Sequence, residues 1–401
     1  MSPPTAQTAA LAPTSSRKPA SRPFLGLIDA VLVDGPGAFV FDGSIGREQA
    51  AAAWTWMLRD VAGDLIDPGV TETEPAHVEA VLALTPELVA RASKHLEIAA
   101  ATPESARRLR TQLGSEEAME RLPVVVSALK FRDRIDQAQE FGRSANAMAD
   151  ESQLALALQS MPFNDRSVAA LLLHAAVGQV SNPSRMITAA IRLAGSAEEA
   201  VLQRAGTGVI VEAMFAHAQG QIAVLNPLGV FGDVDLLCRA VDRFHRLMRS
   251  VTGYVELNRG SRWSGIAAGL TKSVSARLEP RLRDVAPDLN KALRRRDGVD
   301  RLDPDMVLSA LNGMYVLAAV RDARDSLALN ALFDQVWSHT GQALEIHIDR
   351  MFEQIRQDPS DQVSSKRLDA ALKMAELRFG LDYADTLRRA KATAERRLNS
   401  A

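Results

Sequence analysis

Residues 345–349 hold the densest group of metal-ligand residue types in the sequence. Glu345, His347 and Asp349 alternate with two isoleucines, and His339 precedes them. In a strand, these three polar side chains would share one face and could converge on a zinc ion. In a helix, the neighbouring apolar residues form one stripe and the polar residues spread over the other side. The helical pattern is longer, so we favour a solvated helix face and predict neither a metal nor another cofactor.

The other candidate nucleophiles and bases lack partners at catalytic spacing. Cys238 is the only cysteine, so no internal disulfide can form, and its amphipathic surroundings favour a packed thiol. His174 lies within the apolar run Leu171–Val177, where a buried histidine is the simplest interpretation. The sequence has no phosphate-binding loop and no complete dinucleotide-binding fingerprint. We therefore predict no catalytic residue, and an enzyme with dispersed active-site residues is the alternative.

Charge is distributed unevenly along the chain. Residues 239–301 contain fifteen Lys or Arg and seven Asp or Glu, which gives a net charge of +8. The whole chain has a net charge of −2, so the other residues together carry −10. Folding does not require such separation, and it indicates a partner of opposite charge. An acidic protein face is the favoured partner, with solvated structural charge, nucleic acid and anionic lipid as alternatives.

Two clusters of arginine define this basic segment. Apolar residues from Leu237 to Val255 recur at intervals of three and four, which predicts an amphipathic helix. At roughly 100° per residue, four arginines fall opposite the apolar stripe or at its flank: Arg239, Arg243, Arg246 and Arg249. Three more end another predicted helix, where they also complement its dipole: Arg294, Arg295 and Arg296. We predict that these seven arginines bind the partner.

Composition indicates helices rather than sheets. The chain has 401 residues, of which 47% are hydrophobic, 24% charged and 5% aromatic, whereas strands are rich in aromatic and β-branched residues. Two apolar runs, Phe24–Val33 and Ala38–Phe41, are joined by turn-forming residues and predict a small N-terminal β-hairpin. A short helix over Leu25–Val33 is the alternative. The predicted fold is all-α, an irregular helical array or multi-helix bundle.

Threonine followed by proline marks two predicted helix starts. These are Thr85-Pro86 and Thr102-Pro103. Each combines a capping hydroxyl with a proline at the first helical position, where the missing N–H costs nothing.

The chain divides into three predicted parts. Residues 1–23 are rich in Pro, Ser, Thr and Ala and contain no acidic residue, which predicts a disordered arm. The sequence Asn226-Pro227-Leu228-Gly229 interrupts the helical pattern. We therefore place an N-terminal helical domain at 24–225, beginning with the hairpin, and a C-terminal helical domain at 233–401.

Function is predicted from these patterns together. We expect a non-enzymatic protein–protein interaction or scaffold protein that presents helical surfaces, with residues 239–301 for an acidic partner. Self-association into a homo-oligomer is left open. No apolar run reaches the length of a membrane span, and a cytoplasmic protein is the expectation. An exported effector with an uncleaved basic N-terminal signal is the alternative.

Overall fold

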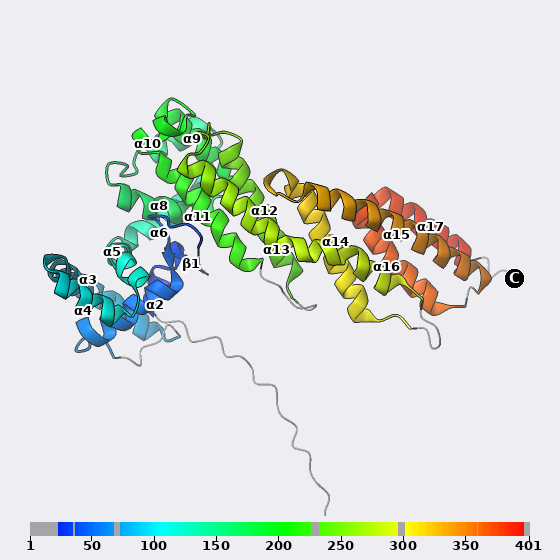
Figure 1. Cartoon of the computed structure of the whole chain (residues 1–401), viewed down its shortest axis with the longest axis horizontal. Coiled ribbons are helices and arrows are strands. Elements are labelled where there is room, and N and C mark those ends of the chain that lie inside the picture. The colour runs from blue at the N-terminus through cyan, green and yellow to red at the C-terminus, as the bar shows by residue number, and fades with distance from the viewer. Residues whose placement is uncertain are drawn as a thin grey trace, which may run out of the picture. The chain divides into compact units, whose positions relative to one another are not determined.

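The chain is a helical protein. The computed structural model describes residues 23–34, 37–67, 73–225, 232–295, 301–358 and 360–396, and 80% of it is helical. Within these ranges it has seventeen α-helices and one two-stranded sheet (Figure 1). The predicted all-α fold is confirmed. The predicted arm at 1–23 lies outside the described residues except for Pro23, at which α1 begins.

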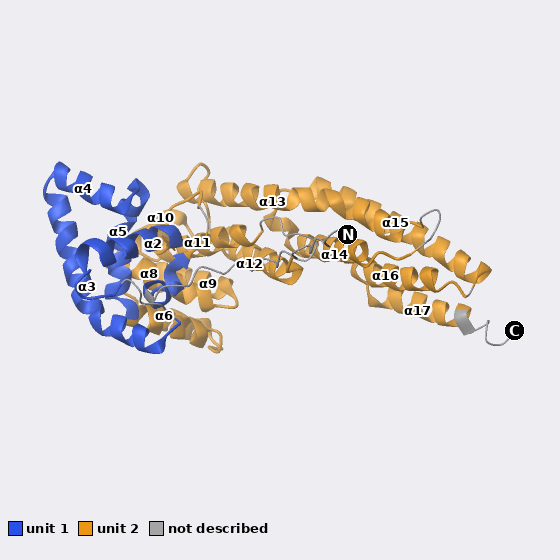
Figure 2. Cartoon of the chain, turned by 90° about the horizontal axis from the view of Figure 1, so that it is seen from below, with its two compact units in different colours: residues 1–32, 47–132 blue, residues 33–46, 133–401 orange. Residues whose placement is uncertain are grey.

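The chain folds as two compact units, which Figure 2 colours separately. Unit 1 comprises residues 1–32 and 47–132, and unit 2 comprises residues 33–46 and 133–401. The predicted domains, 24–225 and 233–401, stay a prediction, because the break between them at 226–231 lies outside the described residues. The helices before and after that break pack against each other within unit 2.

Unit 1 is built from helices around a core that contains two tryptophans. Phe24 stacks on Trp54 with 4.8 Å between ring centroids, and Trp56 is also buried. The described elements are α1 (Pro23–Leu27), the 3-10 turn η1 (Asp29–Val31), α2 (Arg47–Trp56), the π-helical turn η2 (Met57–Val61), α3 (Pro75–Ala101), α4 (Pro103–Leu113) and α5 (Glu116–Lys130). Helix α5 packs against α2 and α3.

One of the two threonine–proline signals begins a helix. Thr102 caps α4, because its Oγ1 accepts a hydrogen bond from Ser105 N at 3.1 Å. The prediction at Thr85 is wrong, since Thr85 and Pro86 lie inside α3. Thr85 Oγ1 instead donates to the Val81 carbonyl at 2.8 Å. Buried residues on both sides of Pro86 hold α3 continuous, so tertiary packing overrides the local signal.

Unit 2 contains the remaining helices, and α8 and α11 lie at its centre. Helix α8 is buried throughout Val168–Val177, and α11 packs against α8, α12 and α13. No helix that the structure describes is long and apolar enough to cross a membrane. The described elements are α6 (Arg132–Ala145), α7 (Glu151–Leu158), α8 (Arg166–Gln179), α9 (Pro183–Ala194), α10 (Glu199–Arg204), α11 (Gly208–Val224), α12 (Val234–Thr252), α13 (Arg262–Leu293), α14 (Pro304–Ala323), η3 (Arg324–Ser326), α15 (Asn330–Gln357), α16 (Gln362–Phe379) and α17 (Leu381–Arg396).

The expected N-terminal strand pair exists, with a different arrangement. Strands β1 (Leu32–Val33) and β2 (Ile45–Gly46) form a parallel pair rather than the two arms of a hairpin. Most of the first apolar run is helical, in α1 and η1, as the alternative held. The second run does not pair with the first because the backbone N–H and C=O of Phe39 bond to a side chain of α11. We call residues 37–46 the strap.

Candidate functional site

The amphipathic helix predicted around Leu237–Val255 is α12. Its apolar stripe is buried as expected, with Val241 and Phe244 at 0% exposure and Met248 at 2%. Asp233 caps the helix, its carboxylate accepting a hydrogen bond from Leu236 N at 2.9 Å. The sequence pattern therefore places the polar face of α12 correctly as a whole.

Four arginines of this helix were predicted to face outward. Three of them are exposed, and two of these three form ion pairs along α12 itself. Arg239 forms an ion pair with Asp235 at 2.8 Å, and Arg246 Nε bonds to Asp242 at 3.1 Å. Both are exposed pairs one turn apart, which contribute only a few tenths of a kcal/mol each. Arg249 is exposed and makes no ion pair with the described residues.

Arg243 does not face outward, which corrects its predicted position. Its guanidinium is partly buried and donates to the Val180 carbonyl at 2.6 Å and the Val177 carbonyl at 2.8 Å. Val177 lies in the last turn of α8 and also accepts a hydrogen bond from Val180 N, whereas Val180 is the residue that follows the helix end. Burial lowers the pKa of Arg243. The side chain of Arg243 therefore caps the C-terminal end of α8 in the same chain.

The second arginine cluster follows the end of α13 at Leu293. Arg294 and Arg295 are exposed, and Arg296 lies outside the described residues. The pKa of Asp361 is lowered by its hydrogen bonds from Ser364 and, to a smaller extent, by the charge of Arg295. The predicted arginines thus have separate local environments, and their binding to a partner stays a prediction.

Residues 345–349 form part of α15, as the helical interpretation predicts. His347 Nε2 lies 3.0 Å from Asn290 Oδ1, and burial lowers the pKa of His347. Among the described residues, no three His, Cys, Asp or Glu side chains are grouped so that they could hold a metal ion.

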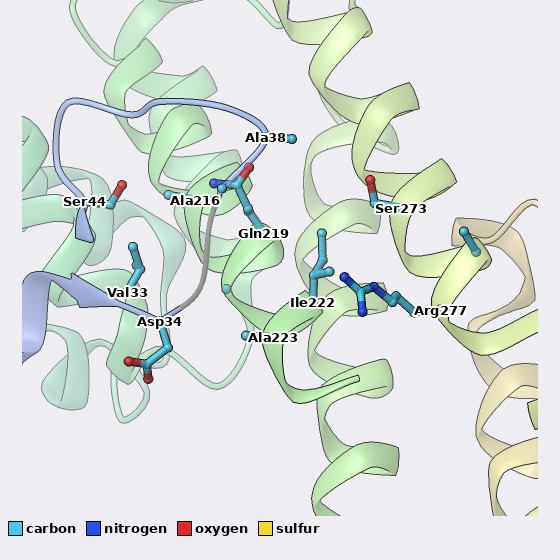
Figure 3. A pocket seen from close by; sticks show the side chains of 13 residues that line it. Val33, Asp34, Ala38, Ser44, Ala216, Gln219, Ile222, Ala223, Ser273 and Arg277 are labelled. Carbon is cyan, nitrogen blue, oxygen red and sulfur yellow. The ribbon is translucent and has the colours of Figure 1, made fainter. Parts of the chain in front are cut away.

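A cavity that the sequence did not indicate lies between the strap, α11 and α13 (Figure 3). Its volume is about 360 Å³. Small residues of α11 and α13 line much of it, and the strap contributes Gly37, Ala38 and Ser44. The polar side chains around it are Asp34, Ser44, Gln219, Ser273 and Arg277. All of these residues belong to unit 2.

The strap is held to α11 by a paired hydrogen bond across 180 residues of sequence. Phe39 N donates to Gln219 Oε1 at 2.9 Å, and Gln219 Nε2 donates to the Phe39 carbonyl at 2.9 Å. The ring of Phe39 lies against Gly269 of α13, where a Cβ atom would approach it to 2.6 Å. Gly37 is similarly close to Gln219. The amide side chain of Gln219 thus satisfies both the N–H and the C=O of Phe39 and holds the strap against α11.

A buried carboxylate fixes the other side of the strap. Glu212 of α11 accepts hydrogen bonds from Arg166 at 3.2 Å and from Arg262 at 2.6 Å. Arg166 also pairs with Asp42 at 3.3 Å, and Arg262 donates to the Val40 carbonyl at 3.1 Å. The two arginines therefore link the strap to α8, α11 and α13. Because Glu212 is almost fully buried, removal of either arginine would leave its charge poorly compensated.

Two stacked histidines lie close to the strap. The rings of His174 in α8 and His217 in α11 are 4.1 Å apart, and His217 Nε2 lies 2.7 Å from the His174 carbonyl. Gly43 of the strap packs against α8 so closely that a Cβ atom would lie 3.2 Å from His174 Cβ. Burial lowers the pKa of His217 to about 4 and that of His174 well below its usual value. Both rings are therefore neutral at pH 7.

Ser44 and Cys238 lie in environments that do not activate them as nucleophiles. Ser44 donates to the Phe41 carbonyl at 3.4 Å, and none of the described residues around the cavity is His, Cys or Lys. Burial raises the pKa of the Cys238 thiol to about 11, which leaves little reactive thiolate at neutral pH. No protein-family model, curated protein or solved structure matches the chain. Function must therefore be inferred from these residues themselves.

No sequence pattern indicated this site. The residues from Asp34 to Gly37 have glycines two positions apart but lack the third glycine of a dinucleotide-binding fingerprint, so their pattern favours a plain turn. Gln219, Ser273 and Arg277 gave no signal, because single polar residues on helices are common. Only the tertiary fold brings them to one cavity.

Proposed function

We propose that this chain is a non-enzymatic binding protein and that the cavity under the strap is its recognition site. The observation that carries the proposal is that the strap is bonded to the helices on both sides. Gln219 holds Phe39, and Arg262, which pairs with Glu212, holds the Val40 carbonyl. Folding of a helical unit does not need such an irregular segment tied down at both ends. The cavity of about 360 Å³ lies in the range of small-molecule sites.

The nature of the polar groups supports binding rather than turnover. An acyl- or phosphoryl-transfer site needs a nucleophile within hydrogen-bond reach of a base. Here the two histidines stack on each other, and Ser44 points its hydroxyl at a backbone carbonyl. The remaining polar groups can orient a ligand by hydrogen bonds.

A cavity-filling variant tests this proposal. Gly220 lines the cavity, and a Cβ atom at this position meets no atom of the described residues within 4 Å, so Gly220→Phe fills space without distorting α11. Gly265 on α13 is equally open and does not line the cavity, which makes Gly265→Phe the matched control. The intact chain is dialysed to equilibrium against a small-molecule extract of its expression host, and compounds enriched on the protein side are identified by mass spectrometry.

We expect a compound enriched by the wild type and by Gly265→Phe but not by Gly220→Phe. Enrichment of nothing by the wild type, or of the same compound by all three proteins, contradicts the proposal. Circular dichroism of each variant confirms that the helices are retained.

An acidic protein partner for residues 239–301 is a second candidate, favoured only at two positions. Arg249 and Arg294 are exposed and make no ion pair with the described residues. Charge reversal by Arg249→Glu with Arg294→Glu should abolish co-purification of such a partner, and unchanged co-purification contradicts this candidate. The cytoplasm stays the expected location, and fractionation of cells that express the chain with and without residues 1–23 tests it against export.

A further inference from the structure

The charged side chains of the cavity are already engaged. Asp34 and Arg277 both line it, and each already interacts with another group of the chain. A charge on the ligand would therefore have to displace an existing partner to find its own, and a charge without a partner is costly to remove from water. The cavity is thus not built to select a ligand by charge.

Two uncharged polar side chains of the lining are engaged as well. Gln219 exchanges two hydrogen bonds with the backbone of Phe39, and the Ser44 hydroxyl donates to the Phe41 carbonyl at 3.4 Å. Both sets of bonds hold residues of the strap in place. Neither side chain can turn toward a ligand without loosening the strap.

Ser273 of α13 differs from these four lining residues. Within the described part of the chain, its hydroxyl forms no hydrogen bond. A hydroxyl inside a helix often donates to the carbonyl four residues before it, as Thr85 and Thr340 do here at 2.8 Å. Figure 3 shows Ser273 on the side of α13 that faces the cavity. The Ser273 hydroxyl can therefore donate one hydrogen bond to a ligand or accept one from it.

The rest of the lining is small and apolar. Val33, Ala38, Ala216, Ile222 and Ala223 contribute hydrocarbon groups to a cavity of about 360 Å³. Such walls favour a hydrocarbon body because its apolar surface is removed from water, and they offer it no hydrogen bond. An apolar wall with one available hydroxyl fits a molecule that is itself apolar except at one oxygen.

We propose that the cavity binds a small uncharged molecule with an apolar body of a few carbon atoms and one hydroxyl or carbonyl oxygen, held by Ser273. This inference rests on the proposed function and specifies its ligand. One hydrogen bond between uncharged groups should contribute roughly fivefold to affinity. Each methylene that is buried should strengthen binding by about fourfold until the apolar space is filled.

Three probes of equal length test whether the ligand is uncharged. Isothermal titration of the intact chain at pH 7 with 1-hexanol, hexanoate and hexylammonium should rank 1-hexanol first, with each ion weaker by about tenfold or more. 1-Butanol should bind more weakly than 1-hexanol. Binding of either ion as tightly as 1-hexanol overturns the proposal, because it would show that a charge of the wall is available to ligands.

Substitution of Ser273 tests the hydrogen bond separately from the apolar walls. Ser273→Ala should weaken 1-hexanol binding roughly fivefold and leave the binding of benzene, which lacks a hydroxyl or carbonyl oxygen, unchanged. Unchanged benzene binding shows that the cavity is intact in the variant. Ser264→Ala is the matched control, since Ser264 lies on the same helix and outside the cavity. Unchanged 1-hexanol affinity in Ser273→Ala refutes the role of Ser273.

The outcomes also separate this inference from the proposed function. If a charged compound is enriched by dialysis and lost in Gly220→Phe, while 1-hexanol does not bind, the ligand class is wrong and the binding function stands. If neither the extract nor any probe binds, both proposals fail.

Discussion

Acid should destabilise unit 2 through the stacked histidines. His217 faces the ring of His174 from α8 and the charge of Arg243 from α12. Its pKa is about 4 in the folded chain, against an ordinary value of 6.5, mainly because burial disfavours the charged ring. Between these values the unfolded chain binds the proton more readily than the folded chain. The contribution of His217 to stability is therefore present above pH 6.5 and is lost as the pH falls toward 4.

The size of the effect follows from the two pKa values of His217. Their difference corresponds to about 3 kcal/mol once the pH is below 4. About 2 kcal/mol of this is lost between pH 7 and pH 5. His174, whose pKa is also lowered by burial, acts in the same direction.

Urea unfolding at pH 7 and pH 5 measures this loss. His217→Gln removes the titrating ring and keeps an N–H that can reach the His174 carbonyl. The free energy of unfolding of this variant should fall by about 2 kcal/mol less than that of the wild type between the two pH values. His339→Gln, at an exposed position of α15, is the control and should follow the wild type. An identical fall in wild type and His217→Gln would refute the reasoning.

Three further predictions concern single side chains. Arg243→Met should lower the free energy of unfolding by about 2 kcal/mol, because both hydrogen bonds to the end of α8 are lost and the Val180 carbonyl loses its guanidinium donor, while Arg239→Gln should change it by less than about 0.5 kcal/mol; equal urea midpoints would contradict this. Gly43→Ala should cost about 2 kcal/mol, because its Cβ would lie 2.1 Å from a backbone carbonyl of α8, whereas Gly220→Ala should be neutral or stabilising; thermal melts compare them. Alkylation of Cys238 by iodoacetamide should be slow at pH 8 and rise toward pH 11, in line with its raised pKa; rapid alkylation of the folded chain at pH 8 would disprove the burial argument.

Periodicity predicts this protein well where a helix is long and amphipathic. The stripe through Val241, Phe244 and Met248 is buried as its spacing requires. A helical wheel, however, gives only the direction of a side chain and not its neighbours. Arg243 points away from that stripe on the wheel, yet α8 lies within reach of its guanidinium. Backbone carbonyls of the same chain therefore accept hydrogen bonds from an arginine that the sequence assigns to the surface.

The cavity could not be predicted from the sequence, because the contacts that form it join residues far apart in the chain. The bond between Phe39 and Gln219 joins residues 180 positions apart, and neither residue has a neighbour that signals it. The same holds for Glu212, which the sequence places in an apolar helix without indicating Arg166 or Arg262. Pattern analysis sees residues within a few turns of each other, whereas these contacts depend on how α8, α11 and α13 assemble.

The place of the strap in the chain has a consequence for biosynthesis. The strap, residues 37–46, emerges from the ribosome before most of unit 1, yet it belongs to unit 2 and needs α13, which begins at Arg262. At roughly 5–20 residues per second, the strap waits on the order of 10 s or more for that helix. Until then Phe39 and Phe41 lack the residues against which they pack in the folded chain. Transiently exposed apolar side chains of this kind are what chaperones bind. Translation that stops before α13 yields a chain without the pocket.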